Sequence, residues 1–186
     1  MKVVGVDEAG RGPLAGPVVA AAVYLENWQT RELLSLGLND SKKLSPKRRE
    51  ALFEAVLNMG VCWRAQAASP ARIDKYNILN ATLWAMKRAV VQLPLKPDLV
   101  VIDGNMPIGL DLCTEKSIVG ADSKVPSVAV ASIIAKVLRD RAMVRFSRMF
   151  PQYGFERHKG YPTKEHYAVL RELGPCKLHR KSFRLL

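Results

Sequence analysis

The stretch that decides the fold lies near the N-terminus, where residues 2–12 read KVVGVDEAGRG. Its first five residues are rich in valine, which predicts a buried strand over residues 2–6. Two adjacent acids, Asp7 and Glu8, end that strand, and Gly10 and Gly12 then allow a tight turn. Because neighbouring carboxylates repel one another, this arrangement is costly for a purely structural element. A hairpin turn whose acids face water is the structural alternative.

The rest of the chain predicts a mixed α/β sheet with helices on its faces. Apolar stretches predict strands over residues 17–25, 61–68, 98–103 and 116–119, and the first of these is expected to pair with the N-terminal strand. Helices are expected over residues 47–59, 76–92, 127–149 and 163–174. Ser45, Pro46 and Gly60 bracket the first helix with residues typical of helix ends.

Two further acids stand at the ends of expected elements. Asp103 closes the 98–103 strand, and Asp122 precedes the 127–149 helix. The carboxyl end of a buried strand is where α/β sheets place functional groups, whereas an Asp-Gly turn or a capping aspartate is the structural alternative. With Asp7 and Glu8 they make four hard oxygen ligands of the kind that magnesium prefers. Adjacent strand residues point to opposite faces, so Asp7 and Glu8 share one metal only if the strand twists; otherwise they contribute differently.

The chain is strongly basic, and the charge is uneven. Its 186 residues include 29 Lys and Arg against 17 Asp and Glu, a formal net charge of +12. Residues 136–186 carry 13 of the basic residues and only 4 of the acidic ones. This excess fits a polyanionic partner, nucleic acid before a membrane surface, although a solvated basic face is the structural alternative. A basic surface beside an acidic cluster suits phosphodiester hydrolysis with two metal ions.

Composition and cysteine usage bound the class of protein. With 48% hydrophobic and 25% charged residues, we expect one globular domain over residues 1–186, with a small helical part from about residue 150. Cys62, Cys113 and Cys176 are far apart and form no zinc-binding spacing with the histidines, which predicts a reduced, cytoplasmic chain. The longest apolar run, residues 13–25, is too short to cross a bilayer, so no membrane or targeting segment is expected.

Several motifs in a fixed order make the sequence similar to type 2 ribonuclease H, and in particular to bacterial ribonuclease HII. They read VDEAGRGPLAGPV (6–18), DSKKLS (40–45), IDGN (102–105), ADS (121–123), ASIIAKVLRD (131–140) and HKGY (158–161). The resemblance covers nearly the whole chain, and a series of motifs is far more specific than one Asp-Glu pair. It implies a ribonuclease H-like fold, with a five-stranded mixed sheet flanked by helices and a small C-terminal helical segment.

The same resemblance implies an activity. It is endonucleolytic cleavage of the RNA strand of RNA–DNA hybrids, and of single ribonucleotides embedded in duplex DNA. The reaction is expected to use two ions of Mg²⁺ or Mn²⁺, to leave 3′-hydroxyl and 5′-phosphate ends, and to serve the removal of misincorporated ribonucleotides. The family's metal-binding acids map onto Asp7, Glu8, Asp103 and Asp122.

The resemblance also implies a set of substrate contacts, which are Gly10, Arg11, Gly12, Tyr161, Lys42 and Lys43. The Gly-Arg-Gly turn is expected to contact the ribose 2′-hydroxyl, the one group that marks RNA against DNA. Tyr161 is expected to lie against the sugar on the deoxyribonucleotide side of the junction. A partly buried ring beside Pro162 is the structural alternative for this tyrosine.

Partners and competing functions complete the expectations. The chain is expected to act as a monomer. Residues 182–186 could bind a sliding clamp, although a disordered or docked basic end is favoured. Two other functions stay open on the residues alone: a structure-selective DNA nuclease of the same broad fold, and a non-catalytic nucleic-acid-binding protein whose acids serve in turns.

Overall fold

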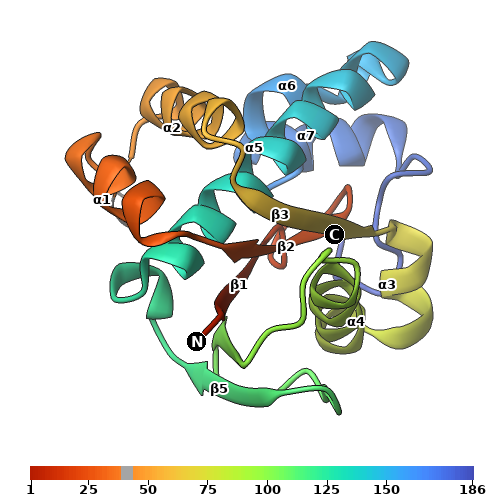
Figure 1. Cartoon of the computed structure of the whole chain (residues 1–186). Helices are drawn as coiled ribbons and strands as arrows, with labels where there is room; N and C mark the ends of the chain where they lie inside the picture. The colour runs from red at the N-terminus through yellow and green to blue at the C-terminus, as the bar shows by residue number, and fades with distance from the viewer. Residues whose placement is uncertain (39–43) are drawn as a thin grey trace.

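A five-stranded mixed sheet forms the centre of the computed structural model, which describes residues 1–38 and 44–186 (Figure 1). The strands are β1 (Val3–Ala9), β2 (Val18–Tyr24), β3 (Cys62–Ala68), β4 (Leu99–Asp103) and β5 (Thr114–Ile118). Their order across the sheet is β3-β2-β1-β4-β5. The β1–β2 and β2–β3 pairs are antiparallel, whereas β1–β4 and β4–β5 are parallel. The predicted mixed sheet is therefore confirmed.

Helices cover both faces of this sheet. They are α1 (Asn27–Ser35), α2 (Pro46–Asn58), α3 (Pro70–Tyr76), α4 (Ile78–Val91), α5 (Pro126–Met149), α6 (Phe155–His158) and α7 (Lys164–Leu173), with short 3₁₀ turns η2 (Ala121–Ser123) and η3 (Pro151–Tyr153). In Figure 1, α4 lies on one side of the strands, and α1 and α2 lie on the other. None of the helices in the described ranges is both long and apolar enough to cross a membrane.

Strand alternation divides the core into two layers. Val4, Val6 and Ala20 pack in one buried cluster with Ala85 of α4. Ala21 and Val23 belong to a second cluster, on the opposite face, with residues of α2 and α5 that include Phe53 and Ile134. Because β2 is buried on both faces, it has no alternating polar residues. Val100 and Ile102 place β4 in the first of these layers beside β1, and these two neighbouring strands carry Asp7 and Asp103.

Two of the expected boundaries were wrong. The first strand does not stop before the acids: Asp7 and Glu8 lie within β1 and pair in register with Ala21 and Ala20. Backbone pairing continues there because ladder hydrogen bonds do not depend on the side chain. The helix expected over residues 76–92 is divided at Asn77, which has a φ of 66° and whose side chain accepts a hydrogen bond from the first turn of α4. The helices α1 and α3 were not expected.

The C-terminal segment packs back against the body of the protein. Gly16 N–H donates to the Leu178 carbonyl, and Arg180 N–H donates to the Leu14 carbonyl, at 2.8 and 2.9 Å. Farther along, Asp74 of α3 accepts hydrogen bonds from the backbone and the hydroxyl of Ser182. Figure 1 shows the C-terminus close to α3 and α4. This is the docked arrangement of the basic end.

Candidate active site

Three aspartates from separate elements converge at one edge of the sheet. Asp7 of β1, Asp103 of β4 and Asp122 of η2 each offer a carboxylate oxygen, and these oxygens all lie within 4.8 Å of one another. β1 and β4 are parallel neighbours, so their carboxyl ends meet at the same edge. Asp122 lies in η2, the short turn that precedes α5. The neighbouring Ala121 N–H donates to Asp103 Oδ1 at 2.8 Å. Asp7 and Asp122 are buried, and Asp103 is half-buried.

Glu8, the fourth predicted ligand, lies outside this cluster of three. It follows Asp7 in a regular strand, so the two side chains leave the strand on opposite faces. Glu8 still lines the cavity that contains Asp7 and Asp103, and it also lines a smaller cavity beside α4. Its Oε1 is 3.7 Å from Nη1 of Arg11. The two adjacent acids thus occupy different positions, as strand geometry requires.

The electrostatics of the cluster favour a bound cation. Burial raises the pKa of Asp7 well above its ordinary value, and the neighbouring carboxylates of Glu8 and Asp103 raise it further. Burial also raises the pKa of Glu8, although Arg11 opposes this effect. Carboxylates that are crowded and desolvated in this way are stabilised by a divalent ion, which replaces the lost hydration with oxygen coordination. The donor set therefore fits a hard cation such as Mg²⁺ or Mn²⁺.

A cavity of about 270 Å³ opens over these acids. Its lining consists of Asp7, Glu8, Ala9, Gly10, Arg11, Arg49, Asp103, Ser132, Lys136 and Tyr161. Acids that can hold a metal and cations that can hold phosphates therefore share one space. The centroid of the Tyr161 ring lies 5.4 Å from Lys136 Nζ, and Tyr161 is partly exposed to solvent. Lys42 and Lys43 lie outside the described residues.

The two glycines of the turn differ in what surrounds them. Gly10 has a φ of +96°, and a Cβ at this position would lie 2.0 Å from Nε of Arg139. Gly12 has no atom within 4 Å of its would-be Cβ. The fold itself therefore requires glycine at position 10. At position 12 the missing side chain leaves open space, which a ligand can enter.

Two buried arginines beneath the turn were missed in the sequence. Arg139 stands among the basic residues of α5, yet its side chain is fully buried. It donates to the carbonyls of Ala15 and Pro17. Arg180, also fully buried, donates to three carbonyls between residues 10 and 16. Nothing in a basic C-terminal stretch distinguishes these arginines from solvated ones.

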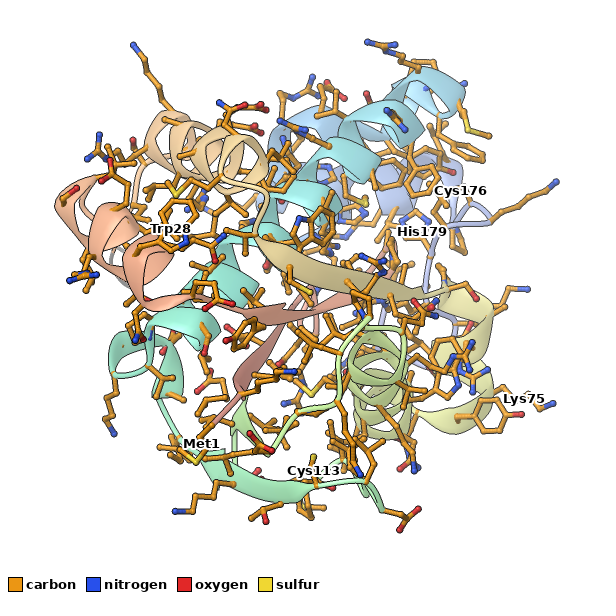
Figure 2. The ribbon with its side chains drawn as sticks, viewed as in Figure 1. Met1, Trp28, Lys75, Cys113, Cys176 and His179 are labelled. Atoms are coloured by element: carbon orange, nitrogen blue, oxygen red, sulfur yellow. The ribbon has the colours of Figure 1, made fainter. Side chains whose placement is uncertain are left out.

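A second unexpected feature is a chain of hydrogen bonds in which His179 and His166 connect Cys176 to the backbone of Tyr161. Cys176 N–H donates to Nδ1 of His179, so the proton of that neutral ring is on Nε2. Nε2 of His179 lies 3.0 Å from Nε2 of His166, which must accept, and His166 Nδ1 then donates to the Tyr161 carbonyl at 2.9 Å. Figure 2 labels His179 beside Cys176. This chain of bonds holds the backbone of Tyr161 in place.

A basic groove lies beside the cavity over the acids. It has a volume of about 470 Å³, lies between α2 and α5, and is lined by Arg49, Arg141, Arg145, Arg148 and Lys159 together with Pro46, Glu50, Val137, Asp140 and Val144. Arg49 lines both spaces, so they are neighbours. Arg141 is engaged by Glu50, whereas Arg145 and Arg148 are exposed on the later turns of α5. The groove is suited to a polyanion.

Comparison with known proteins places this geometry in a family. A family model described as Ribonuclease HII matches residues 4–186. A ribonuclease HII of Polaromonas sp. is 51% identical over 179 residues, which are 96% of this chain and 87% of that protein. The crystal structure of ribonuclease H2 from Pyrococcus horikoshii OT3 superposes with a TM-score of 0.84 at 29% identity, covering 100% of this chain and 95% of the other.

A second solved structure agrees with the first. The PCNA:RNase HII complex from Archaeoglobus fulgidus contains a chain with a TM-score of 0.84 and 29% identity, covering 99% of this chain and 96% of that one. The predicted ribonuclease H-like fold is therefore confirmed. From the match over nearly its whole length, the chain belongs to the ribonuclease HII family of metal-dependent hydrolases, which cleave RNA endonucleolytically in RNA–DNA hybrids.

Proposed function

We propose that this protein cleaves both continuous RNA–DNA hybrids and single ribonucleotides embedded in duplex DNA, by two-metal-ion hydrolysis. The observation that carries the proposal is the convergence of Asp7, Asp103 and Asp122, whose oxygens lie within 4.8 Å of one another beside Glu8. Three carboxylates from different elements are costly to bury together unless a cation compensates them. The cellular role that follows is removal of ribonucleotides misincorporated into DNA.

The chain's own residues supply the binding and orientation. Asp7, Asp103 and Asp122 would hold the metal, with Glu8 at the margin of the site. Divalent ions, Mg²⁺ or Mn²⁺, would activate the attacking water and stabilise the leaving oxygen. When the water oxygen bonds to phosphorus, the bond to the 3′-oxygen breaks. The products then carry a 3′-hydroxyl, which has taken up a proton, and a 5′-phosphate.

Recognition of the ribonucleotide belongs to the turn and to Tyr161. Open space beside Gly12 lets the backbone approach a sugar, and Arg11, whose side chain is 51% exposed, can reach a phosphate. Tyr161 would pack on the sugar of the following deoxyribonucleotide. Lys42 and Lys43 are proposed as further substrate contacts on the motif resemblance alone.

Flanking nucleic acid would occupy the basic groove between α2 and α5. Its exposed Arg145 and Arg148 face no acidic partner among the described residues, so they are available to backbone phosphates. We further propose that the protein works as a monomer in the cytoplasm. The ribonuclease HII of Archaeoglobus fulgidus is known in a complex with PCNA, and a clamp contact through residues 182–186 is a secondary proposal for this chain.

Cleavage of matched duplexes tests the function. Three substrates of one sequence would be compared: a duplex with one ribonucleotide, a continuous RNA–DNA hybrid and an all-DNA duplex, each with Mg²⁺, Mn²⁺ or EDTA. We expect metal-dependent cleavage of the first two only. Equal cleavage of all-DNA would indicate a structure-selective DNA nuclease, and no cleavage with either metal would indicate a binding protein.

Loss of one metal ligand tests the site. Asp103→Asn should lower turnover by about 10³-fold or more, because several kcal/mol of transition-state stabilisation depend on the metal. Its affinity for the ribonucleotide duplex in EDTA should stay within about 3-fold, since phosphate contacts dominate binding. The matched control is Asp111→Asn, an exposed acid outside the cluster, which should retain full activity. Wild-type turnover in Asp103→Asn would refute the metal assignment.

A further inference from the structure

Arg180 reaches the N-terminal turn from the far end of the chain. Its Nη2 donates to the Gly10 carbonyl at 2.6 Å, its Nη1 to the Arg11 carbonyl at 2.9 Å, and its Nε to the Gly16 carbonyl at 3.0 Å. We propose that Arg180 is a positioning residue: it orients the peptides of the Gly10–Gly12 turn toward the substrate and so sets the preference for a ribonucleotide. This inference rests on the proposed function of that turn.

Peptide geometry links the bound carbonyls to the opposite side of the turn. The Gly10 carbonyl shares a peptide unit with Arg11 N–H, and the Arg11 carbonyl shares one with Gly12 N–H. In a trans peptide the C=O and N–H groups point in opposite directions, and the described residues contain no cis peptide. Because both carbonyls point to the buried guanidinium, both N–H groups point away from it.

These two N–H groups are placed to donate to a ligand. Arg11 and Gly12 are exposed, and no described residue accepts a hydrogen bond from either backbone N–H. Gly10 and Arg11 line the cavity over the acids. Successive backbone N–H groups in a turn make a concave donor site, and a 2′-hydroxyl oxygen can accept from it. A deoxyribose leaves those donors unpaired, so the orientation of the turn becomes a source of selectivity.

The choice of arginine at this position supports positioning over simple packing. Neither Arg180 nor Arg139 forms an ion pair with an acid among the described residues; the two cations are buried against backbone carbonyls, with the rings of Phe183 and Tyr161 beside them. Burial and the nearby charge of Arg139 both lower the pKa of Arg180. An unpaired buried charge is costly, and apolar side chains would fill the same space without that cost. Only the planar fork of arginine satisfies three carbonyls at fixed angles.

The backbone around Arg180 is itself held. Its N–H donates to the Leu14 carbonyl at 2.9 Å, and the preceding residue, His179, forms a β-bridge with Ala15. These backbone contacts fix the Cα of Arg180, and so restrict the positions that its guanidinium can take at the turn. Gly10 packs directly on the side chain of Arg139, the second arginine, which supports the same segment.

Binding without metal separates positioning from a structural role. In EDTA, we would measure the Kd of wild type, Arg180→Lys and Arg180→Ala for a duplex with one ribonucleotide and for the all-DNA duplex of the same sequence. Wild type should prefer the ribonucleotide by about 10-fold, the value of one or two hydrogen bonds. Both variants should lose this preference, with the Kd for all-DNA within about 3-fold of wild type. Arg157→Ala, which removes an exposed arginine paired with Glu165, is the matched control and should keep the preference.

Chemical rescue sharpens the test. Guanidinium at about 20 mM, far below the molar range that unfolds proteins, should restore the preference in Arg180→Ala by entering the vacated space. It should do nothing for Arg180→Lys, whose side chain occupies that space without reproducing the fork. If either variant keeps the preference for the ribonucleotide, or if both affinities fall together, Arg180 is a structural residue only and the proposal is overturned.

A measurement on the unaltered protein covers variants that do not fold. The backbone amide resonances of Arg11 and Gly12 should shift further on adding the ribonucleotide duplex than on adding all-DNA at the same saturation, because only the ribonucleotide offers a 2′-hydroxyl. Equal shifts with both duplexes would overturn the proposal. Failure of the proposed function is recognised separately, because wild type would then neither cleave nor prefer the ribonucleotide duplex.

Discussion

Gly10→Ala should destabilise the folded protein, whereas Gly12→Ala should leave its stability unchanged and lower its activity. At position 10 the backbone has a φ of +96°, which costs a non-glycine residue about 1–2 kcal/mol. The new Cβ would also lie 2.0 Å from Nε and 2.4 Å from Cδ of Arg139, and 2.9 Å from the Pro17 carbonyl oxygen. Arg139 must move, because a buried backbone oxygen cannot.

That movement sets the magnitude. Arg139 would give up its hydrogen bonds to the carbonyls of Pro17 and Ala15, at 2.9 and 3.1 Å. Hydrogen bonds to charged groups contribute about 1.5–3 kcal/mol each. With the backbone strain, Gly10→Ala should lose about 4–8 kcal/mol, which is comparable with the whole stability of a typical domain. At position 12 no atom lies within 4 Å, so Gly12→Ala should change stability by less than about 1 kcal/mol.

Urea unfolding, followed by kinetics on the single-ribonucleotide duplex, measures both effects. Gly10→Ala should be largely unfolded. Gly12→Ala should unfold like wild type and yet cleave about 10–100-fold more slowly, since its methyl group occupies the space that the sugar enters. A Gly10→Ala protein as stable as wild type would refute the packing argument. Full activity in Gly12→Ala would show that the sugar does not approach that glycine.

Two further predictions concern the groove and the histidines. Arg145→Gln combined with Arg148→Gln should reduce the slope of log Kd against log salt by about 1–2, because two phosphate contacts are lost. The control Arg88→Gln on α4 should leave this slope unchanged. An unaltered slope in the double variant would mean that the duplex binds elsewhere. For His179, burial lowers the pKa from 6.5 to about 4. As the pH falls, the unfolded chain therefore binds a proton before the folded protein does. The free energy of unfolding is unaffected above pH 6.5 and decreases by about 3 kcal/mol as the pH falls toward 4. Urea unfolding of wild type and His179→Gln between pH 7.5 and 4.5 should show a shallower pH dependence in the variant, and identical slopes would contradict a neutral, hydrogen-bonded ring.

Much of this protein can be read in its sequence, because the information is local. The capping residues around α2 and the apolar stretch of β4 predict their elements correctly, since caps and periodicity act over a few residues. The spacing of Asp7, Asp103 and Asp122 at the ends of elements anticipates their convergence. The ordered motifs also identify the family, because each motif reflects a chemical requirement at its own position.

The tertiary structure decided what depends on partners distant in the chain. Pairing with β2 extends β1 to include Asp7 and Glu8, and the pleat of the strand directs their two side chains to opposite faces of the sheet. No local pattern marks Arg139 and Arg180 as buried, because the carbonyls that satisfy them belong to residues more than 100 positions away. The contact between His166 and His179 spans only 13 positions, yet it too depends on how the C-terminal segment folds back. Burial of a polar group is determined by whichever distant groups compensate it, and only the folded chain brings those groups together.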